Sequence, residues 1–296
     1  MVFLSGCPLR CAYCHNPDTW ARPPAFEMEA SEVLARALRY RSYWRSEGGI
    51  TVSGGEPLTQ LDFLIDLFTR AKAQGVSTCI DTSAAPFTRE GEWFVKFERL
   101  MESTDLLLLD IKAFDPGLHK ALTGKDNANI LDCARYLSDI GKPVWIRHVF
   151  VPDMARLLGS DRGELESDGV VPQSAPNKTQ SAPNKTLSNP NKTLSDPNTA
   201  LTDPNPTLSD PNKTLNDPNQ ALTDPNTALT DPNPTLNDSN SVANFAKSLK
   251  NVKRIDVLPY HVFGVEKWKA LGLPYRLAAA EPPSKEATDR IRALFT

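Results

Sequence analysis

Short apolar runs alternate with amphipathic segments along most of this chain. The apolar runs have the length and composition of buried β-strands, whereas the intervening segments carry apolar residues at helical spacing. Strands are predicted at residues 50–53, 77–80, 106–109, 143–151 and 254–258, and residues 1–4 are expected to be the end of a further strand. Helices are predicted at residues 28–46, 61–71, 90–101 and 127–140, with another one starting near Val242.

The order strand, glycine turn, helix recurs along the chain. Strands that alternate with helices favour a parallel sheet with right-handed crossovers. Five or six such units suit an incomplete barrel. The sequence therefore predicts an α/β fold.

Residues 161–240 differ from the rest of the chain in composition. A seven-residue repeat beginning Asp-Pro-Asn runs through this stretch, for example at residues 196–198 and 203–205. The period of seven is that of a coiled coil, but each proline in a helix interior costs about 3 kcal/mol. A β-solenoid is the alternative, although one leucine per repeat offers little to bury. We therefore predict a disordered insertion between two parts of one barrel, residues 1–160 and 241–296.

The overall charge is close to neutral, with 33 Lys and Arg residues against 36 Asp and Glu residues. This balance gives no basic field that would attract nucleic acid as a main partner. The sequence has no run of about 18 apolar residues and no secretion signal, so no membrane span is expected. We therefore expect a cytoplasmic protein, in a compartment that keeps thiols reduced.

Three cysteines, Cys7, Cys11 and Cys14, lie within eight residues of one another near the N-terminus. Iron–sulfur clusters are held by cysteine thiolates, and a short loop can bring three of them to one centre. The loop has no fourth cysteine, which indicates an iron with a free position for a substrate or cofactor. A zinc site completed by His15 is an alternative, although its spacing to Cys14 is too tight for the usual zinc pattern. A disulfide framework is less favoured, because the other two cysteines lie in a predicted strand and helix.

Functional residues of parallel α/β barrels gather at the carboxyl ends of the strands. Gly54 and Gly55 stand at such an end, where glycines either let a ligand approach the backbone or simply form a tight turn. Asp81 and Asp110 close the next two strands. Two neighbouring acids repel each other unless a cation or Lys112 lies between them, so an ion pair with Lys112 is the structural alternative to a bound cation.

Two more polar residues stand out on the later strands. Arg147 lies in an otherwise apolar strand, so its charge needs a partner, either a cofactor or substrate carboxylate or a structural acid. His261 follows the last predicted strand, where a lone histidine is either structural or functional.

The spacing C-x3-C-x2-C, with Tyr13 before the last cysteine, resembles the cluster loop of the radical S-adenosylmethionine (radical SAM) enzymes. Residues 14–20, Cys-His-Asn-Pro-Asp-Thr-Trp, narrow the resemblance to activases of glycyl-radical enzymes, and most closely to those of pyruvate formate-lyase. The resemblance covers nearly all of the chain outside the repeat and implies a partial (β/α)6 TIM-like barrel. The family has a further N-terminal segment, so we expect that the protein starts upstream of Met1 or is truncated.

The resemblance also implies roles for individual residues. The expected ligands of a [4Fe-4S] cluster are Cys7, Cys11 and Cys14. The expected ligands of a monovalent cation are Asp81, Thr82 and Asp110. The expected contacts with S-adenosylmethionine are Tyr13, His15, Gly54, Gly55, Glu56, Asp110, Lys112, Arg147 and His261.

The implied reaction is the reductive cleavage of S-adenosylmethionine to methionine and a 5′-deoxyadenosyl radical, which takes hydrogen from a backbone glycine of pyruvate formate-lyase. The cofactors carry this chemistry, and the barrel positions them. A one-electron donor such as flavodoxin is a further expected partner, and the protein is expected to be a monomer that serves anaerobic glucose metabolism. An activase of another glycyl-radical enzyme and a catalytically impaired iron–sulfur binding protein are the alternatives.

Overall fold

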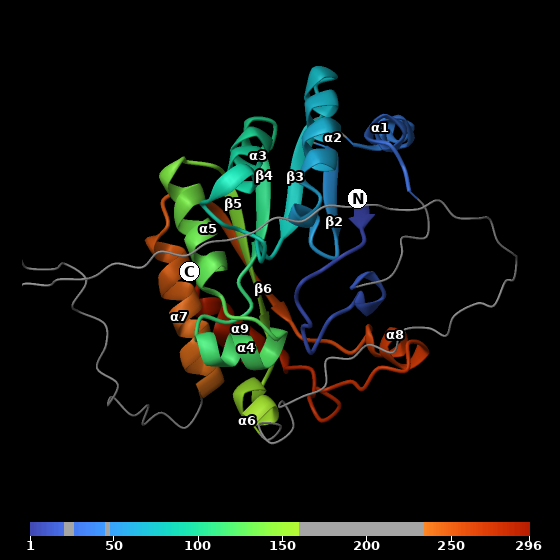
Figure 1. Cartoon of the computed structure of the whole chain (residues 1–296). Coiled ribbons are helices and arrows are strands. Elements are labelled where there is room, and N and C mark those ends of the chain that lie inside the picture. The colour runs from blue at the N-terminus through green and yellow to red at the C-terminus, as the bar shows by residue number, and fades with distance from the viewer. Residues whose placement is uncertain (21–26, 45–47, 160–233) are drawn as a thin grey trace, which may run out of the picture. The chain divides into compact units, whose positions relative to one another are not determined.

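A computed structural model describes residues 1–20, 27–44, 48–159 and 234–296 (Figure 1). Most of the predicted insertion at 161–240 lies outside the described residues. Of the helices that are described, none is long and apolar enough to cross a membrane.

The described residues form one sheet in which all neighbouring strands are parallel and follow one another in chain order (Figure 1). Its strands are β1 (Val2–Leu4), β2 (Gly49–Gly54), β3 (Ser77–Thr82), β4 (Leu106–Asp110), β5 (Val144–Phe150) and β6 (Val252–Pro259). The sheet is open, because β1 and β6 each pair with a single neighbour. The predicted α/β fold with a partial (β/α)6 barrel is therefore confirmed.

Helices connect the strands. They are α1 (Ala30–Leu38), α2 (Leu61–Ala73), α3 (Gly91–Glu102), α4 (Pro116–Thr123), α5 (Ala128–Asp139), α6 (Met154–Gly159), α7 (Pro234–Ser248), α8 (Val265–Ala270) and α9 (Lys285–Leu294). Short 3-10 turns lie at η1 (Pro17–Thr19), η2 (Arg41–Tyr43) and η3 (Pro57–Thr59). Two of the predicted helices differ from their expected bounds by more than two residues.

The helix predicted over 28–46 was wrong in length, because α1 ends at Leu38. Beyond it Tyr40 and Tyr43 are exposed, and the separate turn η2 brings Trp44 back against the main core, so the chain leaves the helical path there. The helix expected from near Val242 begins earlier, at Pro234, inside the stretch predicted as the insertion. Proline is favoured in the first turn of a helix, because its fixed φ suits that position.

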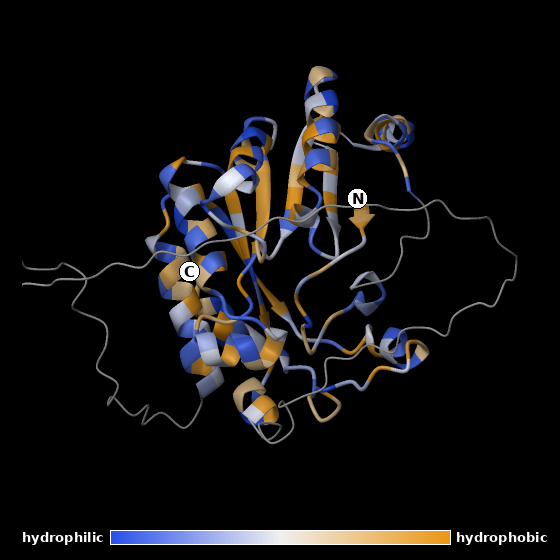
Figure 2. Ribbon diagram, viewed as in Figure 1, coloured by the Kyte–Doolittle hydropathy of each residue, from blue (hydrophilic) through white to orange (hydrophobic). Residues whose placement is uncertain are grey.

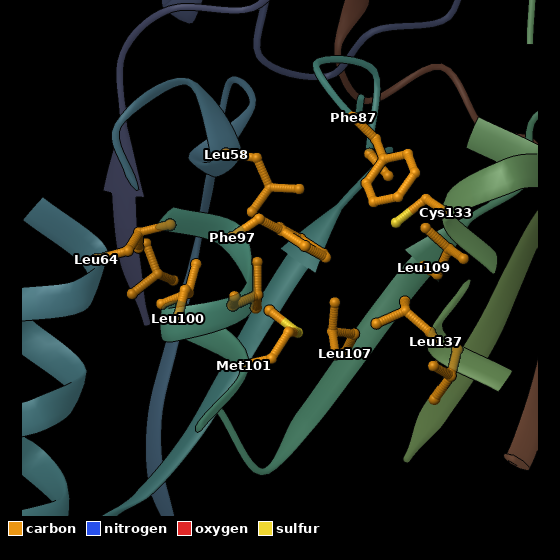
Figure 3. Packing of buried hydrophobic residues seen from close by; sticks show 14 of the residues in the cluster. Leu58, Leu64, Phe87, Phe97, Leu100, Met101, Leu107, Leu109, Cys133 and Leu137 are labelled. Carbon is orange, nitrogen blue, oxygen red and sulfur yellow. The ribbon is translucent and has the colours of Figure 1, made fainter. Parts of the chain in front are cut away.

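The main core lies between the sheet and the helices around it (Figure 3). Side chains alternate along each strand, so Leu107 and Leu109 of β4 point at the helices and meet Phe97 of α3 and Leu137 of α5. The helices carry hydrophobic and hydrophilic residues in turn, whereas β4 is mainly hydrophobic (Figure 2). The other face of each strand lines the inside of the barrel, where polar residues are free to gather.

A second apolar cluster lies under the cysteine loop. It joins the loop to α4, α6 and the C-terminal segment, and its buried members are Leu9, Cys11, Ala12, Tyr13, Leu122, Val151, Met154, Leu158, Tyr260, Leu277 and Ala280. The loop therefore has a core of its own and does not depend on β1 alone for its position.

Candidate active site

The cysteine loop is fastened at both ends by backbone hydrogen bonds. Gly6 N donates to Thr19 O at 2.7 Å, which closes the loop on itself. Arg10 N and Ala12 N donate to the last carbonyls of α4, those of Thr123 and Leu122, at 2.8 and 2.9 Å. The final carbonyls of a helix have no partner within it, so α4 offers a ready acceptor surface for the loop. This contact fixes the part of the loop that carries the thiols.

The three thiols of the loop are free and lie in a largely desolvated setting. Burial raises the pKa of Cys7 to about 11 and that of Cys11 to about 12, and it also raises the pKa of Cys14. The Lys112 ammonium opposes this effect at all three thiols, so its positive charge faces the whole loop. Without a metal the thiols therefore stay protonated, and a bound metal would have to displace their protons.

The glycines at the end of β2 hold the base of the loop against the sheet. Gly54 has a φ of +121°, and a Cβ there would lie 2.2 Å from Leu4 O. A Cβ on Gly55 would lie 2.1 Å from Gly6 O. The close approach lets Gly55 N donate to Leu4 O at 2.8 Å. Gly54 and Gly55 therefore form the tight turn that was one of their two interpretations, and their contact with a cofactor stays a prediction.

Glu56, which follows these glycines, is buried and fully engaged by protein donors. Its Oε1 accepts from Leu58 N at 3.1 Å and from the Thr82 hydroxyl at 2.5 Å. Its Oε2 accepts from Ser83 N at 2.9 Å and from Ser83 Oγ at 2.6 Å. Burial raises the pKa of Glu56 even though these four donors oppose it. The carboxylate thus joins the end of β2 to the end of β3 through protein hydrogen bonds.

A chain of polar contacts crosses the inside of the barrel from β2 to β5. The Ser53 hydroxyl donates to Asp81 at 2.8 Å, and the Arg147 guanidinium donates to Asp81 and, at 2.8 Å, to Asp110. Lys112 Nζ donates to the other oxygen of Asp110 at 3.1 Å. Two acids are therefore balanced by two cationic side chains, which is the ion-pair alternative that the sequence left open.

Thr82 does not join Asp81 in this network. The two residues are neighbours on β3, so their side chains point to opposite faces of the sheet, and Thr82 contacts Glu56 on the helix side. The structure therefore does not bring the Thr82 side chain to the two carboxylates, and a monovalent cation at Asp81, Thr82 and Asp110 stays a prediction.

The two acids differ in their protonation. Burial alone would raise the pKa of Asp110, but Lys112 and Arg147 outweigh it and lower that pKa. Burial and the charge of Asp110 raise the pKa of Asp81, although Arg147 opposes them. Asp110 has two cationic partners and Asp81 only one, so we assign the firmly ionised carboxylate to Asp110.

The segment after β6 packs against the cysteine loop. The rings of His15 and His261 stack at 4.2 Å, with 7° between their planes. The Trp268 indole N–H donates to Cys14 O at 2.8 Å. A Cβ on Gly264 would lie 2.8 Å from the His15 ring, so glycine alone permits the approach. The two ends of the chain therefore build the site together.

A cavity of about 1110 Å³ lies elsewhere, between β1, α1 and α2. It contains none of the predicted site residues. Val33, Trp44 and Phe63 are among the residues that line it, so it sits outside the polar inner face of the barrel.

Comparison with known proteins places the chain in a family. The model of the radical SAM superfamily matches residues 1–155. A pyruvate formate-lyase-activating enzyme of Streptococcus mutans serotype c is 38% identical over 99% of this chain and 81% of its own length. One of Listeria monocytogenes serovar 1/2a is 38% identical over 97% of this chain and 84% of its own. The chain belongs to the radical SAM superfamily and, within it, to the family of these activating enzymes.

Among solved structures, a domain of a pyruvate-formate lyase-activating enzyme from Bacteroides vulgatus matches this radical SAM chain with a TM-score of 0.45 and 17% identity. The match covers 83% of this chain and 92% of that domain.

The donor set of this radical SAM protein fits a cluster better than a single ion. Within the described ranges, no three His, Cys, Asp or Glu side chains converge as ligands of one metal ion. This absence applies to the loop thiols as much as to zinc ligands; what disfavours zinc is that His15, its expected fourth ligand, is stacked on His261. Three separate thiols on one loop are the donors that an iron–sulfur cluster with a free iron position requires.

Two buried polar atoms beside the loop suit a polar cofactor. In the part of the chain that the structure describes, the Tyr13 hydroxyl and His261 Nδ1 have no hydrogen-bond partner. A buried polar group without a partner costs about 1–3 kcal/mol, so a bound molecule that pairs with it gains affinity. Both residues were predicted from the sequence to contact S-adenosylmethionine, and their unpaired atoms fit that prediction.

Several residues that support the site were not predicted. Ser53 and Ser83 hold two of the carboxylates, and Asp238 of α7 accepts from Phe114 N and Asp115 N, at 2.9 and 2.7 Å, just beyond Lys112. Nothing in the spacing of these side chains marks them, because each acts across the fold. The helices α4 and α9 could have been predicted from their N-caps, since the side chains of Asp115 and Ser284 cap them.

Proposed function

We propose that this protein generates the glycyl radical of pyruvate formate-lyase, using S-adenosylmethionine and an iron–sulfur cluster. The observation that supports this most directly is a three-thiol loop beside the charged inner face of an open parallel barrel, in a chain that belongs to the family of these activating enzymes. The cluster, when bound, supplies the electron that cleaves S-adenosylmethionine to methionine and the 5′-deoxyadenosyl radical.

The loop cysteines Cys7, Cys11 and Cys14 would hold the cluster, because they are the only thiols that share one short segment. Lys112 faces all three thiols, so it offsets part of the negative charge that they gain as metal ligands. Burial alone would lower the pKa of Lys112, but the Asp110 carboxylate beside it outweighs burial, and the pKa lies well above its ordinary value. The ammonium therefore keeps its charge in this buried position.

Tyr13 and His261 would bind the polar groups of the cofactor through their unpaired atoms, and His15 would keep His261 in place by stacking on it. The backbone of Gly54 and Gly55 lies at the base of the loop and would approach the cofactor closely. Three of the predicted contacts act in a different way. Asp110 and Arg147 are already paired with each other, so we assign them to shaping the inner face, whereas Glu56 joins β2 to β3 on the helix side of the sheet.

We also propose that the protein acts as a monomer, takes its electron from a small donor such as flavodoxin, and receives pyruvate formate-lyase as a folded partner. β1 and β6 are the edge strands of the described sheet, so the barrel is not closed there by strand pairing.

Anaerobic reconstitution with iron and sulfide tests the proposal. The reduced protein is expected to release 5′-deoxyadenosine from S-adenosylmethionine and to give pyruvate formate-lyase a glycyl radical signal in electron paramagnetic resonance. Cys11→Ser is expected to lose iron and both activities, whereas Cys133→Ala, which removes a buried thiol far from the loop in sequence, is expected to keep them.

Two results would contradict the proposal in different ways. If Cys11→Ser binds as much iron as the unaltered protein, the loop does not hold the cluster. If the unaltered protein cleaves S-adenosylmethionine but forms a glycyl radical only on a different glycyl-radical enzyme, the proposed partner is wrong and the proposed reaction is correct.

A further inference from the structure

Phe263 is an apolar residue whose side chain is exposed to solvent at the rim of the candidate site. It is 84% exposed, the largest exposed fraction among the large hydrophobic residues that the structure describes. Val262 and Leu258, on the same stretch of chain, are 44% and 40% exposed. Single exposed apolar residues are common, but several on one short segment indicate a contact surface. We call residues 262–263 the apolar tip.

Neighbouring residues hold the backbone of the apolar tip in place. Val262 O accepts from Val265 N at 3.0 Å, and the next residue, Gly264, is wedged against His15. The Phe263 ring lies against the His261 ring, with 4.5 Å between their centroids. Because the backbone beneath Phe263 is already ordered, a partner that covers the ring has less of the chain to immobilise, which favours an anchor.

The apolar tip is connected to the cluster loop through two ring contacts. Phe263 contacts His261, His261 stacks on His15, and His15 directly follows the ligand Cys14. A molecule that covers Phe263 therefore reaches the edge of the place where the reaction would occur.

The chemistry of the proposed reaction limits what such an anchor can bind. The target residue is a glycine, which has no side chain that an enzyme could hold. Binding energy must therefore come from the residues on either side of it. An outward-facing tip cannot enclose a small molecule, but it can insert between the apolar side chains of another protein, and aromatic residues carry much of the energy in such contacts.

We propose that the apolar tip is the anchor for the polypeptide segment that carries the target glycine in the partner protein. Phe263 would pack between apolar residues that flank this glycine and so bring the backbone to the rim of the site. This inference rests on the proposed function, because it takes a glycyl-radical enzyme as the partner.

The test compares Phe263→Ser with Tyr43→Ser, a matched change at an aromatic residue that is 80% exposed in η2, outside the candidate site. Each reconstituted protein is titrated with pyruvate formate-lyase, and the initial rate of glycyl radical formation is followed by electron paramagnetic resonance. For Phe263→Ser the KM for the partner protein is expected to rise at least tenfold. Phe263→Leu, which keeps an apolar side chain, is expected to bring the KM most of the way back to that of the unaltered protein. Tyr43→Ser is expected to match the unaltered protein.

Iron content is measured for each variant so that rates are compared per cluster. If Phe263→Ser at equal iron content keeps the KM of the unaltered protein, the anchor is excluded. If Phe263→Ser loses iron, Val262→Ser is titrated in its place. A raised KM for the partner protein then supports the anchor, and an unchanged KM excludes it. If sedimentation shows that the unaltered protein dimerises through Phe263 while partner binding is untouched, the tip binds a second copy and the inference fails. The proposed function fails separately, when the unaltered protein makes no glycyl radical at all.

Discussion

At the scale of single residues, two buried carboxylates show how differently the fold treats the same group. Glu56 receives four hydrogen bonds, two on each oxygen. Asp238 receives two, both on Oδ1, while within the described residues its buried Oδ2 has no partner. Burial raises the pKa of Asp238 to about 6, against the two backbone donors, and the charge of Asp115 adds to the rise. Asp238 is therefore close to titration near neutral pH.

Asp238 should make the free energy of unfolding depend on pH. Because its pKa is higher in the folded state, the folded protein binds the extra proton between about pH 4 and pH 6. The contribution of Asp238 to the free energy of unfolding is thus fully present below about pH 4 and is lost as the pH rises from about 4 to about 6. A shift of two pKa units corresponds to about 3 kcal/mol. In Asp238→Asn this pH-dependent loss of unfolding free energy is expected to disappear. Urea unfolding of the iron-free protein at pH 4.5, 5.5 and 7 measures it.

The control for this measurement is Asp62→Asn, an exposed residue on α2. Its pH dependence should match that of the unaltered protein. An equal slope in all three proteins would show that Asp238 does not titrate in this range.

At the scale of elements, the site depends on the contact between the cysteine loop and the segment that leads into α8. Gly264 allows the approach, Trp268 binds Cys14 O, and Lys267 Nζ donates to Asn16 at 2.8 Å and pairs with Asp18 at 3.1 Å. The exposed ion pair adds little, because such pairs contribute about 0–1 kcal/mol. The steric fit at Gly264 is therefore the more sensitive part of the contact.

Gly264→Ala is expected to weaken the retention of iron. The new Cβ would lie within 3.1 Å of two atoms of His15 and of Cys14 O, so α8 and the loop must separate. We expect iron loss to a chelator to become several-fold faster, followed by the absorbance of the cluster. Gly159→Ala, where a Cβ would meet no atom within 4 Å, is the control and should leave this rate unchanged. Equal rates in the two variants would mean that the segment does not hold the loop.

At the scale of the whole molecule, the barrel separates an apolar outer core from a charged inner face, and the described residues on either side of 160–233 lie close together. Ala155 N of α6 donates to the Thr235 hydroxyl of α7 at 3.4 Å. Gly159, the last residue of α6, is about 6 Å further along that helix. A short linker can therefore join α6 to α7.

Replacement of residues 160–233 by a Gly/Ser linker of roughly six residues, which spans up to roughly 20 Å, should leave the barrel folded. Each halving of an unstructured loop reduces the cost of closing it by about 0.6 kcal/mol, so the free energy of unfolding is expected to stay equal or rise by up to about 2 kcal/mol. Thermal unfolding and the release of 5′-deoxyadenosine are the two measurements. A lower melting temperature would show that the replaced residues stabilise the barrel.

The strands and the loop were predictable because their signals are local. The apolar runs at β4 and β5 and the spacing of Cys7, Cys11 and Cys14 can be read from a few consecutive residues. The ends of α1 and α7 were missed, because a helix stops where its neighbours no longer cover it and begins where its first turn is capped. Neither condition can be read from an apolar periodicity.

By itself, then, the sequence determined the order of strands and helices, the cysteine loop and the set of polar residues at the strand ends. Only the tertiary structure decided how those polar residues pair. Arg147 bridges Asp81 and Asp110 because parallel strands bring their inward faces together, and Thr82 is excluded because it lies on the opposite face of β3. The partners of a buried charge lie on other strands, so they are fixed by the register of the sheet and not by neighbours in the chain.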